Sequence, residues 1–190
     1  MADNAENTAI ADALKKLIEQ TLKNKCNLEL SGQPQVAERE IIEYNSRMRV
    51  GGLEKFNGPC YVFGLNYYAS EESQAKDEAA GAIIFFIEEE SVEKLLKSLQ
   101  LRGFDEDDQK FVLENLGEFC KSLALDFAQR LQDLGYSRLL LSDVAKAKNN
   151  IVDGLSFPYD RYTYHEISVP LWKKKAMVVD ITMTAVSNIS

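Results

Sequence analysis

The sequence contains little histidine and cysteine, and each shortage excludes a class of site. His165 is the one histidine among 190 residues, so a metal centre built from several imidazoles is excluded and a histidine-dependent triad would have to use His165. Cys26, Cys60 and Cys120 are odd in number and widely spaced, which predicts neither a disulfide framework nor a C-x-x-C zinc knuckle. Reduced thiols are typical of a cytoplasmic protein, and we expect that location here.

Basic residues and long apolar runs are also scarce. The chain has 22 Lys+Arg against 30 Asp+Glu, a formal net charge of −8, which disfavours nucleic acid and anionic membranes as partners. The first ten residues, MADNAENTAI, are acidic, unlike a secretory signal, and no apolar run approaches the roughly 20 residues that span a bilayer. We therefore expect neither secretion nor membrane insertion.

No motif predicts a cofactor or a metal. The chain has no Gly-rich phosphate loop. The acidic run Asp105–Asp108 does not fit a calcium loop, because Lys110 stands where glycine is needed and Leu116 where a bidentate glutamate is needed. We therefore expect no cofactor and no metal ligands.

What the sequence does contain is the composition of a soluble globular domain, with 45% hydrophobic and 27% charged residues. Its length predicts a single domain over residues 1–190. Hydrophobic periodicity predicts three helices, at 8–25 with Thr8 as a cap, 88–98, and 104–134 ending at Gly135. It also predicts strands at 42–50, 61–68, 81–87, 138–141, 162–172 and 176–186, with a loop over 144–157 and a hairpin turn at 173–175. This order predicts an α+β fold with a largely antiparallel sheet, a long helix and shorter helices packed on it.

The longest predicted helix has two distinct sides. At about 100° per residue, its apolar side faces the core and comprises Val112, Leu116, Phe119, Cys120, Leu123, Phe127, Leu131 and Leu134. The opposite side carries Glu114, Glu118, Lys121, Ser122, Leu125 and Gln129. Taken alone, that outward side is a solvated surface with an i,i+3 pair between Glu118 and Lys121.

The segment from Gly81 to Gly135 resembles the CheX/CheC family of chemotaxis phosphatases. The resemblance lies in GAIIFFIEEESVEKLLKSL followed by LENLGEFCKSLALDFAQRLQDLGY, and it extends over residues 81–186. Members of that family dephosphorylate the aspartyl phosphate of a response-regulator receiver domain with a Glu-x-x-Asn motif on the long helix. Laid on that motif, Glu118 matches the acid and Lys121 stands at the position of the asparagine.

The substitution at Lys121 decides the functional expectation. An amide both donates to and accepts from an attacking water, whereas an ammonium group has three donors and no acceptor. The resemblance therefore implies a protein of two-component or chemotaxis signalling that binds a receiver domain with a degenerate phosphatase site. Glu118 and Lys121 are its candidate catalytic positions, and Glu114, Asn115, Ser122 and Leu125 form the candidate binding face.

Two alternatives stay open. In the first, the chain is an active aspartyl-phosphate phosphatase that uses Glu118 with Lys121 or Asn115. In the second, exposed strands and Leu125 make it a self-associating scaffold, since similar domains form homodimers. A literal Glu-x-x-Asn also occurs at Glu54–Asn57, but Gly58-Pro59 follows it and predicts a turn, so we interpret that match as chance. His165 is interpreted as an ordinary strand residue and Cys120 as a core residue.

Overall fold

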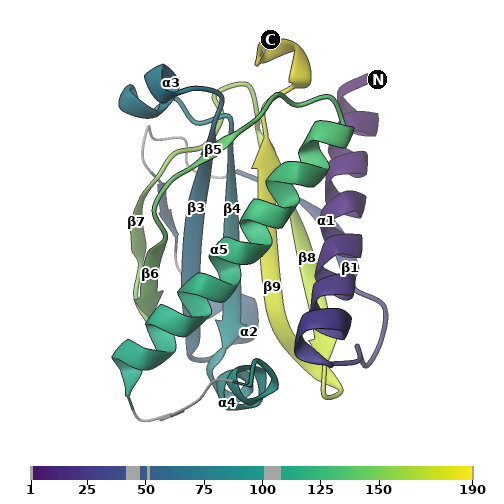
Figure 1. The fold of residues 1–190 in the computed structure, drawn as a ribbon, viewed down its shortest axis with the longest axis vertical. Coiled ribbons are helices and arrows are strands. Elements are labelled where there is room, and N and C mark those ends of the chain that lie inside the picture. The colour runs from purple at the N-terminus through teal and green to yellow at the C-terminus, as the bar shows by residue number, and fades with distance from the viewer. Residues whose placement is uncertain (1, 42–47, 51, 101–107, 190) are drawn as a thin grey trace.

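The computed structural model is an antiparallel sheet with two helices across one face and a smaller cover on the other (Figure 1). It describes residues 2–41, 48–50, 52–100 and 108–189. The helices are α1 (Ala2–Cys26), α2 (Leu53–Phe56), α3 (Glu71–Ala75), α4 (Glu89–Ser98) and α5 (Gln109–Asp133), with a 3-10 turn at Val186–Asn188. The strands are β1 (Gln35–Glu40), β2 (Met48–Val50), β3 (Cys60–Tyr68), β4 (Gly81–Glu88), β5 (Leu140–Leu141), β6 (Ala145–Lys148), β7 (Val152–Leu155), β8 (Thr163–Leu171) and β9 (Lys174–Met183).

The main sheet has the strand order β1-β8-β9-β4-β3-β5, and β6 also pairs with β3. Every pairing in it is antiparallel, as the sequence predicts. Because alternate residues of a strand face opposite sides, the register aligns a row of apolar side chains across the sheet on the side of α1 and α5. This row runs through Phe63, Phe85, Val179 and Ile167.

The larger core lies between that face of the sheet and the helices α1 and α5. The predicted apolar side of α5 packs there, and Leu116, Cys120, Leu123 and Phe127 are fully buried. The hydroxyl of Tyr67 on β3 donates to the carbonyl of Ala124, which ties the sheet to the middle of the helix. Burying one side of α5 in this way leaves its opposite side at the surface.

The other face of the sheet has a separate, smaller core. The sheet residues Cys60, Val62, Ile84, Phe86 and Val178 pack there against Val152 and Leu155 of β7. The cover consists of α2 and the two-stranded β2–β7 ribbon. The single sheet thus separates two hydrophobic clusters.

The ends of α5 follow from local chemistry. Asp108 caps the start, because its carboxylate accepts hydrogen bonds from the backbone N–H groups of Lys110 and Phe111 at 3.0 and 3.1 Å. At the other end Gly135 has a positive φ of 97°, and the N–H groups of Gly135 and Tyr136 donate to the carbonyls of Gln132 and Leu131. This double contact is the Schellman ending that favours glycine, as predicted at Gly135.

The structure corrects four details of the sequence analysis. Thr8 is no cap, since α1 already begins at Ala2. The predicted loop over 144–157 contains β6 and β7. The hairpin turn lies at Trp172 and Lys173, both with positive φ, whereas Lys174 already belongs to β9. The predicted turn at Glu54–Asn57 is the short helix α2 with Asn57 as its left-handed C-cap. Predictions for residues 42–47 and 104–107 lie outside the described residues.

Candidate functional site

The outward side of α5 has the exposure that its sequence predicts. The exposed residues are Glu114, Glu118, Ser122 and Leu125, and 47% of the surface of Leu125 is accessible to solvent. Lys121 is half-buried. The helix therefore brings one exposed apolar side chain, two carboxylates and a cation onto one continuous surface.

The expected ion pair between Glu118 and Lys121 is absent, although both residues are described. The acid that does pair on this helix is Glu114, at 3.9 Å from Lys110. Within the described part of the chain, Glu118 and Lys121 have neither an ion-pair nor a hydrogen-bond partner. Both charged groups consequently remain available to a partner.

Asn115 is differently placed from its neighbours on this side. It is half-buried, and its side-chain amide donates to the Phe111 carbonyl at 2.8 Å, one turn earlier in the same helix. An amide engaged with its own helix is a poor substitute for one that must orient a water molecule. This contact weakens the alternative in which Asn115 replaces the missing asparagine.

Lys146 on β6 is a neighbour of this surface that the sequence analysis did not single out. Lys146 and Phe63 are register partners across β6 and β3, and both side chains lie beneath Gly117 of α5. A methyl group at Gly117 would be 3.7 Å from Lys146 Cδ and 3.9 Å from the Phe63 ring. The alternation Ala-Lys-Ala-Lys at 145–148 was the available signal, because it predicts a strand with both lysines on one side.

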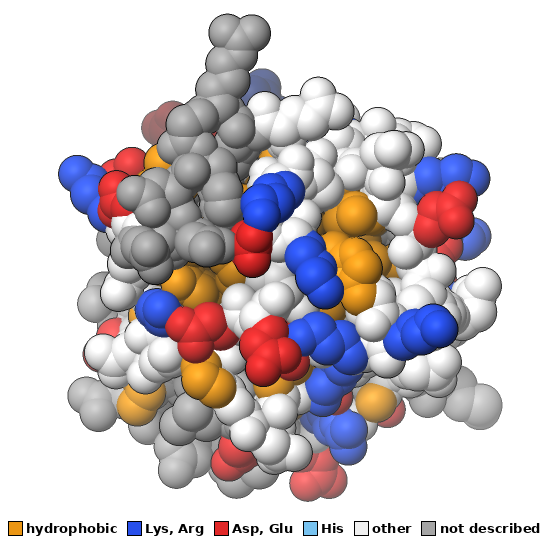
Figure 2. Space-filling model, turned by 90° about the horizontal axis from the view of Figure 1, so that it is seen from below, with side chains coloured by type: hydrophobic (Ala, Val, Ile, Leu, Met, Phe, Trp, Pro, Cys, Tyr) orange, Lys and Arg blue, Asp and Glu red, His pale blue; other side chains and the backbone are white. Residues whose placement is uncertain are grey.

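A second group of lysines lies at the end of the molecule that carries α4 and the β8–β9 hairpin, where Figure 2 shows Lys and Arg side chains beside a hydrophobic patch. These lysines are engaged within the protein. Lys174 pairs with Glu88 and Glu90, and Lys94 lies over the Trp172 ring. Lys148 pairs with Glu89, and Lys175 lies over the Phe56 ring.

A buried ionic cluster lies on the face of the sheet away from α5. Glu166 and Asp180 are directly opposite each other on β8 and β9, which would be unfavourable for two carboxylates alone. Lys55 of α2 lies between them, 2.6 Å from Glu166 and 2.8 Å from Asp180, and its side chain is only 12% exposed. The sequence analysis missed this cluster, because Lys55 is more than a hundred residues away in the chain from both carboxylates.

Electrostatics differ between the two carboxylates of the cluster. Burial raises the pKa of Asp180 to about 7, although the charge of Lys55 opposes this shift. Burial acts in the same direction on Glu166, but hydrogen bonds and the charges of Lys55 and Arg39 outweigh it and lower the Glu166 pKa. One lysine therefore does not compensate both carboxylates equally.

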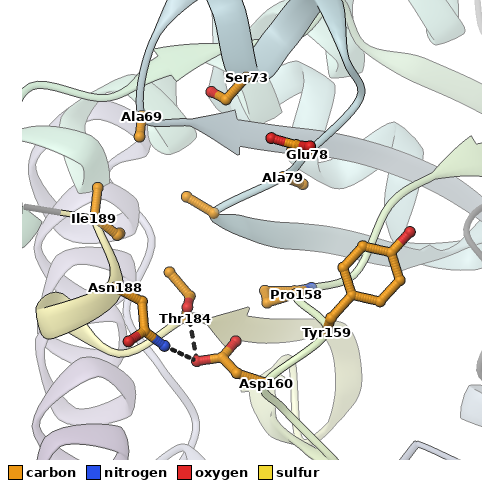
Figure 3. A pocket seen from close by; sticks show the side chains of 11 residues that line it. Ala69, Ser73, Glu78, Ala79, Pro158, Tyr159, Asp160, Thr184, Asn188 and Ile189 are labelled. Carbon is orange, nitrogen blue, oxygen red and sulfur yellow. Dashed lines mark hydrogen bonds between the residues drawn. The ribbon is translucent and has the colours of Figure 1, made fainter.

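The pocket in Figure 3 lies at the end of the sheet near α3 and has a volume of about 290 Å³. Asp160 on its wall accepts hydrogen bonds from Thr184 Oγ1 at 2.7 Å, Asn188 Nδ2 at 2.9 Å and the Ala185 N–H at 3.1 Å. These contacts hold the 3-10 turn of the chain against the loop that precedes β8. Asp160 is thus engaged in hydrogen bonds that hold the fold together at this end of the sheet.

The remaining candidates are structural. His165 is 8% exposed on β8, and burial lowers its pKa, with Glu38 and Asp12 opposing. Cys120 is fully buried, which raises its pKa well above the usual value and disfavours the thiolate. Within the described residues, no group of three or more His, Cys, Asp or Glu side chains could hold a metal ion. None of the described helices has the length and apolarity to cross a membrane.

Comparison of the sequence with models of protein families, and with curated proteins, gives no match. Solved structures do match. A CheC-like superfamily protein from Shewanella sp. PV-4 has a TM-score of 0.59 at 12% identity, over 92% of this chain and 97% of that one. FliY from Thermotoga maritima has a TM-score of 0.56 at 12% identity, over 97% and 93% of the two chains. The chemotaxis protein CheX from Desulfovibrio desulfuricans has a TM-score of 0.55 at 11% identity, over 92% and 98%. The chain therefore has the fold of the CheC/CheX-like proteins.

Proposed function

We propose that this chain is a CheX/CheC-like protein of chemotaxis or two-component signalling, and that it binds a response-regulator receiver domain through the outward side of α5. The observation that carries the proposal is the exposed Leu125 beside Glu118 and Lys121, two charged groups without partners among the described residues. An apolar centre surrounded by charges is the usual composition of a protein-binding surface. These residues lie on α5, the long helix of the fold, and the family resemblance assigns its motif to the same helix.

The same surface supports binding more strongly than catalysis. Lys121 occupies the position of the family's asparagine, and an ammonium group provides no acceptor for a water molecule. Asn115 is engaged with the Phe111 carbonyl and does not supply the missing amide. The chain therefore binds its partner without the amide-dependent hydrolysis of the aspartyl phosphate.

Binding of purified receiver domains from the same organism, measured by titration calorimetry, tests the proposal. We expect Leu125→Asp to weaken binding at least about tenfold, or about 1.4 kcal/mol, because it puts a charge into the apolar centre of the surface. Val36→Asp is the matched control, since Val36 is 41% exposed on the distant strand β1. Failure of every receiver to bind, or an equal loss in the control, would contradict the proposal.

The dephosphorylation rate of the same receivers separates binding from catalysis. We expect no acceleration by the wild type and a gain of activity in Lys121→Asn, which restores the amide. Glu118 is exposed and unpaired within the described residues, so an active phosphatase that uses Glu118 is the competing hypothesis. Acceleration by the wild type that disappears in Glu118→Ala would establish that alternative.

A further inference from the structure

The cluster of Lys55, Glu166 and Asp180 has a chemistry that the proposed function does not use. Lys55 Nζ lies 3.0 and 2.8 Å from the two carboxylate oxygens of Asp180 and 2.6 Å from Glu166 Oε2. Because both Asp180 oxygens are bonded to Cγ, the lysine nitrogen is about 3 Å from that carbon, which is the separation of a near-attack arrangement. A primary amine therefore faces a carboxyl carbon that it can attack.

The surroundings of the cluster exclude most of the water that would otherwise hydrate it. The side chains of Lys55 and Asp180 are buried, and Lys55 Nζ lies over the rings of Phe86 and Tyr164. Such a site favours a neutral amine beside a protonated carboxyl more than water does, because burial penalises separate charges. Burial also raises the pKa of Asp180 to about 7, so the protonated carboxyl is populated at neutral pH.

Glu166 has the opposite character and supplies a base. Burial raises its pKa, but the hydrogen bond and charge of Lys55, with the charge of Arg39, outweigh burial and lower the pKa. For Lys55 itself, burial lowers the pKa, but Asp180 and Glu166 outweigh burial and raise it, so the ammonium form prevails and a reaction of the amine is slow. Two carboxyl groups whose pKa values are pushed apart are the usual acid and base of one site.

We propose that Lys55 and Asp180 join in an amide bond within the chain, with Glu166 as the catalytic base. Glu166 accepts a proton from the Lys55 ammonium, and the amine attacks Cγ of protonated Asp180. The Nζ–Cγ bond forms and the bond from Cγ to the hydroxyl breaks. Glu166 passes its proton to the departing hydroxyl, which leaves as water, then takes the second proton of the nitrogen and releases it to solvent. The step needs no oxidant, reductant or further reactant.

Burial stabilises the product of this reaction. A neutral amide replaces two buried charges and removes the cost of their desolvation. Glu166 keeps Arg39 as a cationic neighbour at 3.4 Å. The bond joins α2 to β9 across 125 positions of the chain, so it fastens the cover of the smaller core to the sheet. Titration of Asp180 is accordingly a property of the chain before linkage.

Intact mass spectrometry of the purified chain, followed through an overnight incubation at neutral pH, tests the bond. We expect a species lighter by one water molecule than the sequence requires, in a fraction that grows with time and is absent in Lys55→Arg and Asp180→Ala. Asp126→Ala is the matched control and should lose water like the wild type, because the Lys25–Asp126 pair lies at 2.7 Å but has side chains 52% and 33% exposed. An unchanged mass of the wild type would overturn the proposal.

Fragmentation of a protease digest locates the bond, and we expect a branched peptide that contains Lys55 and Asp180. Glu166→Gln keeps the size of the side chain but removes the base, so it should slow linkage at least about tenfold. Linkage of Glu166→Gln at the wild-type rate would overturn the role of Glu166. A water loss confined to Asp153-Gly154, where the side chain can cyclise onto the backbone, would overturn the assignment to the cluster. Neither measurement involves a receiver, so both outcomes are independent of the proposed function.

Discussion

At the scale of single residues, the most constrained group is the cluster of Lys55, Glu166 and Asp180. Asp180 is 8% exposed in its side chain, and Lys55 also lies over the rings of Phe86 and Tyr164 at 5.0 and 5.2 Å. Both carboxylates share Lys55, but Arg39 pairs with Glu166 at 3.4 Å, so the more deeply buried Asp180 is the one that tends to bind a proton. The pKa of Asp180 is raised because its burial outweighs the opposing charge of Lys55.

This pKa predicts how stability depends on pH. The pKa of Asp180 is about 7 in the folded protein against an ordinary value of 3.8, so the folded state holds a proton that the unfolded state has released between these values. The free energy of unfolding should therefore fall as the pH rises from about 4 to about 7. Urea denaturation across this range should give a flatter curve for Asp180→Asn than for the wild type.

Asp126→Asn is the control for that experiment, because Asp126 forms a more exposed ion pair with Lys25 at 2.7 Å. Its curve should follow the wild type. Parallel curves for Asp180→Asn and the wild type would show that Asp180 does not titrate in this window.

Sequence reasoning predicts surface residues better than buried polar contacts. The outward residues of α5 follow from helical periodicity alone, since that pattern needs no knowledge of distant segments. Periodicity did not identify Lys55 or Lys146, and the reason differs between the two residues. Lys55 lies on a helix of four residues and contacts side chains of β8 and β9. Contacts between such distant segments leave no pattern in the local sequence. The importance of Lys146 depends on which helix crosses β6.

At the scale of elements, long segments were predicted correctly and short ones were not. The strands β3, β4, β8 and β9 and the helices α4 and α5 agree with the predicted ranges to within a few residues, apart from the part of 104–134 that the structure does not describe. The strands β6 and β7 have four residues each and were assigned to a loop. In β7 only Val152 and Leu155 are buried, which is not the alternation that identifies a strand, and its pairing with β2 is irregular.

Close packing of β7 on the sheet predicts the effect of one methyl group. A Cβ at Gly64 of β3 would lie 2.3 Å from Leu155 Cδ1, and Leu155 is itself buried. Gly64→Ala should therefore lower the free energy of unfolding by about 1–3 kcal/mol through overpacking. Gly58→Ala, where nothing lies within 4 Å, should change it by less than about 1 kcal/mol. Equal stability of the two variants in urea denaturation would contradict the packing of β7 described above.

At the scale of the whole molecule, the edge strand β1 and the region around Leu125 are two surfaces on which copies of the chain could associate. The strand β1 carries Glu38, Arg39 and Glu40, and charged edge strands disfavour pairing between copies. The net charge of −8 adds repulsion between copies. We therefore predict a monomer of 21.4 kDa by light scattering at micromolar concentration. A mass twice as large would favour the self-associating scaffold instead.

The two-sided arrangement of the cores has a consequence for the order of folding. The cover over the smaller core pairs Met48 with Leu155, residues more than a hundred positions apart, whereas β3 and β4 are close neighbours in the chain. Contacts that close long loops form slowly, because the entropy of closure must be overcome before the contacts contribute. We therefore expect the β3–β4 hairpin to form early and the β2–β7 ribbon to dock late. The surface of α5 belongs to the opposite side, so it can reach its native form before that docking is complete.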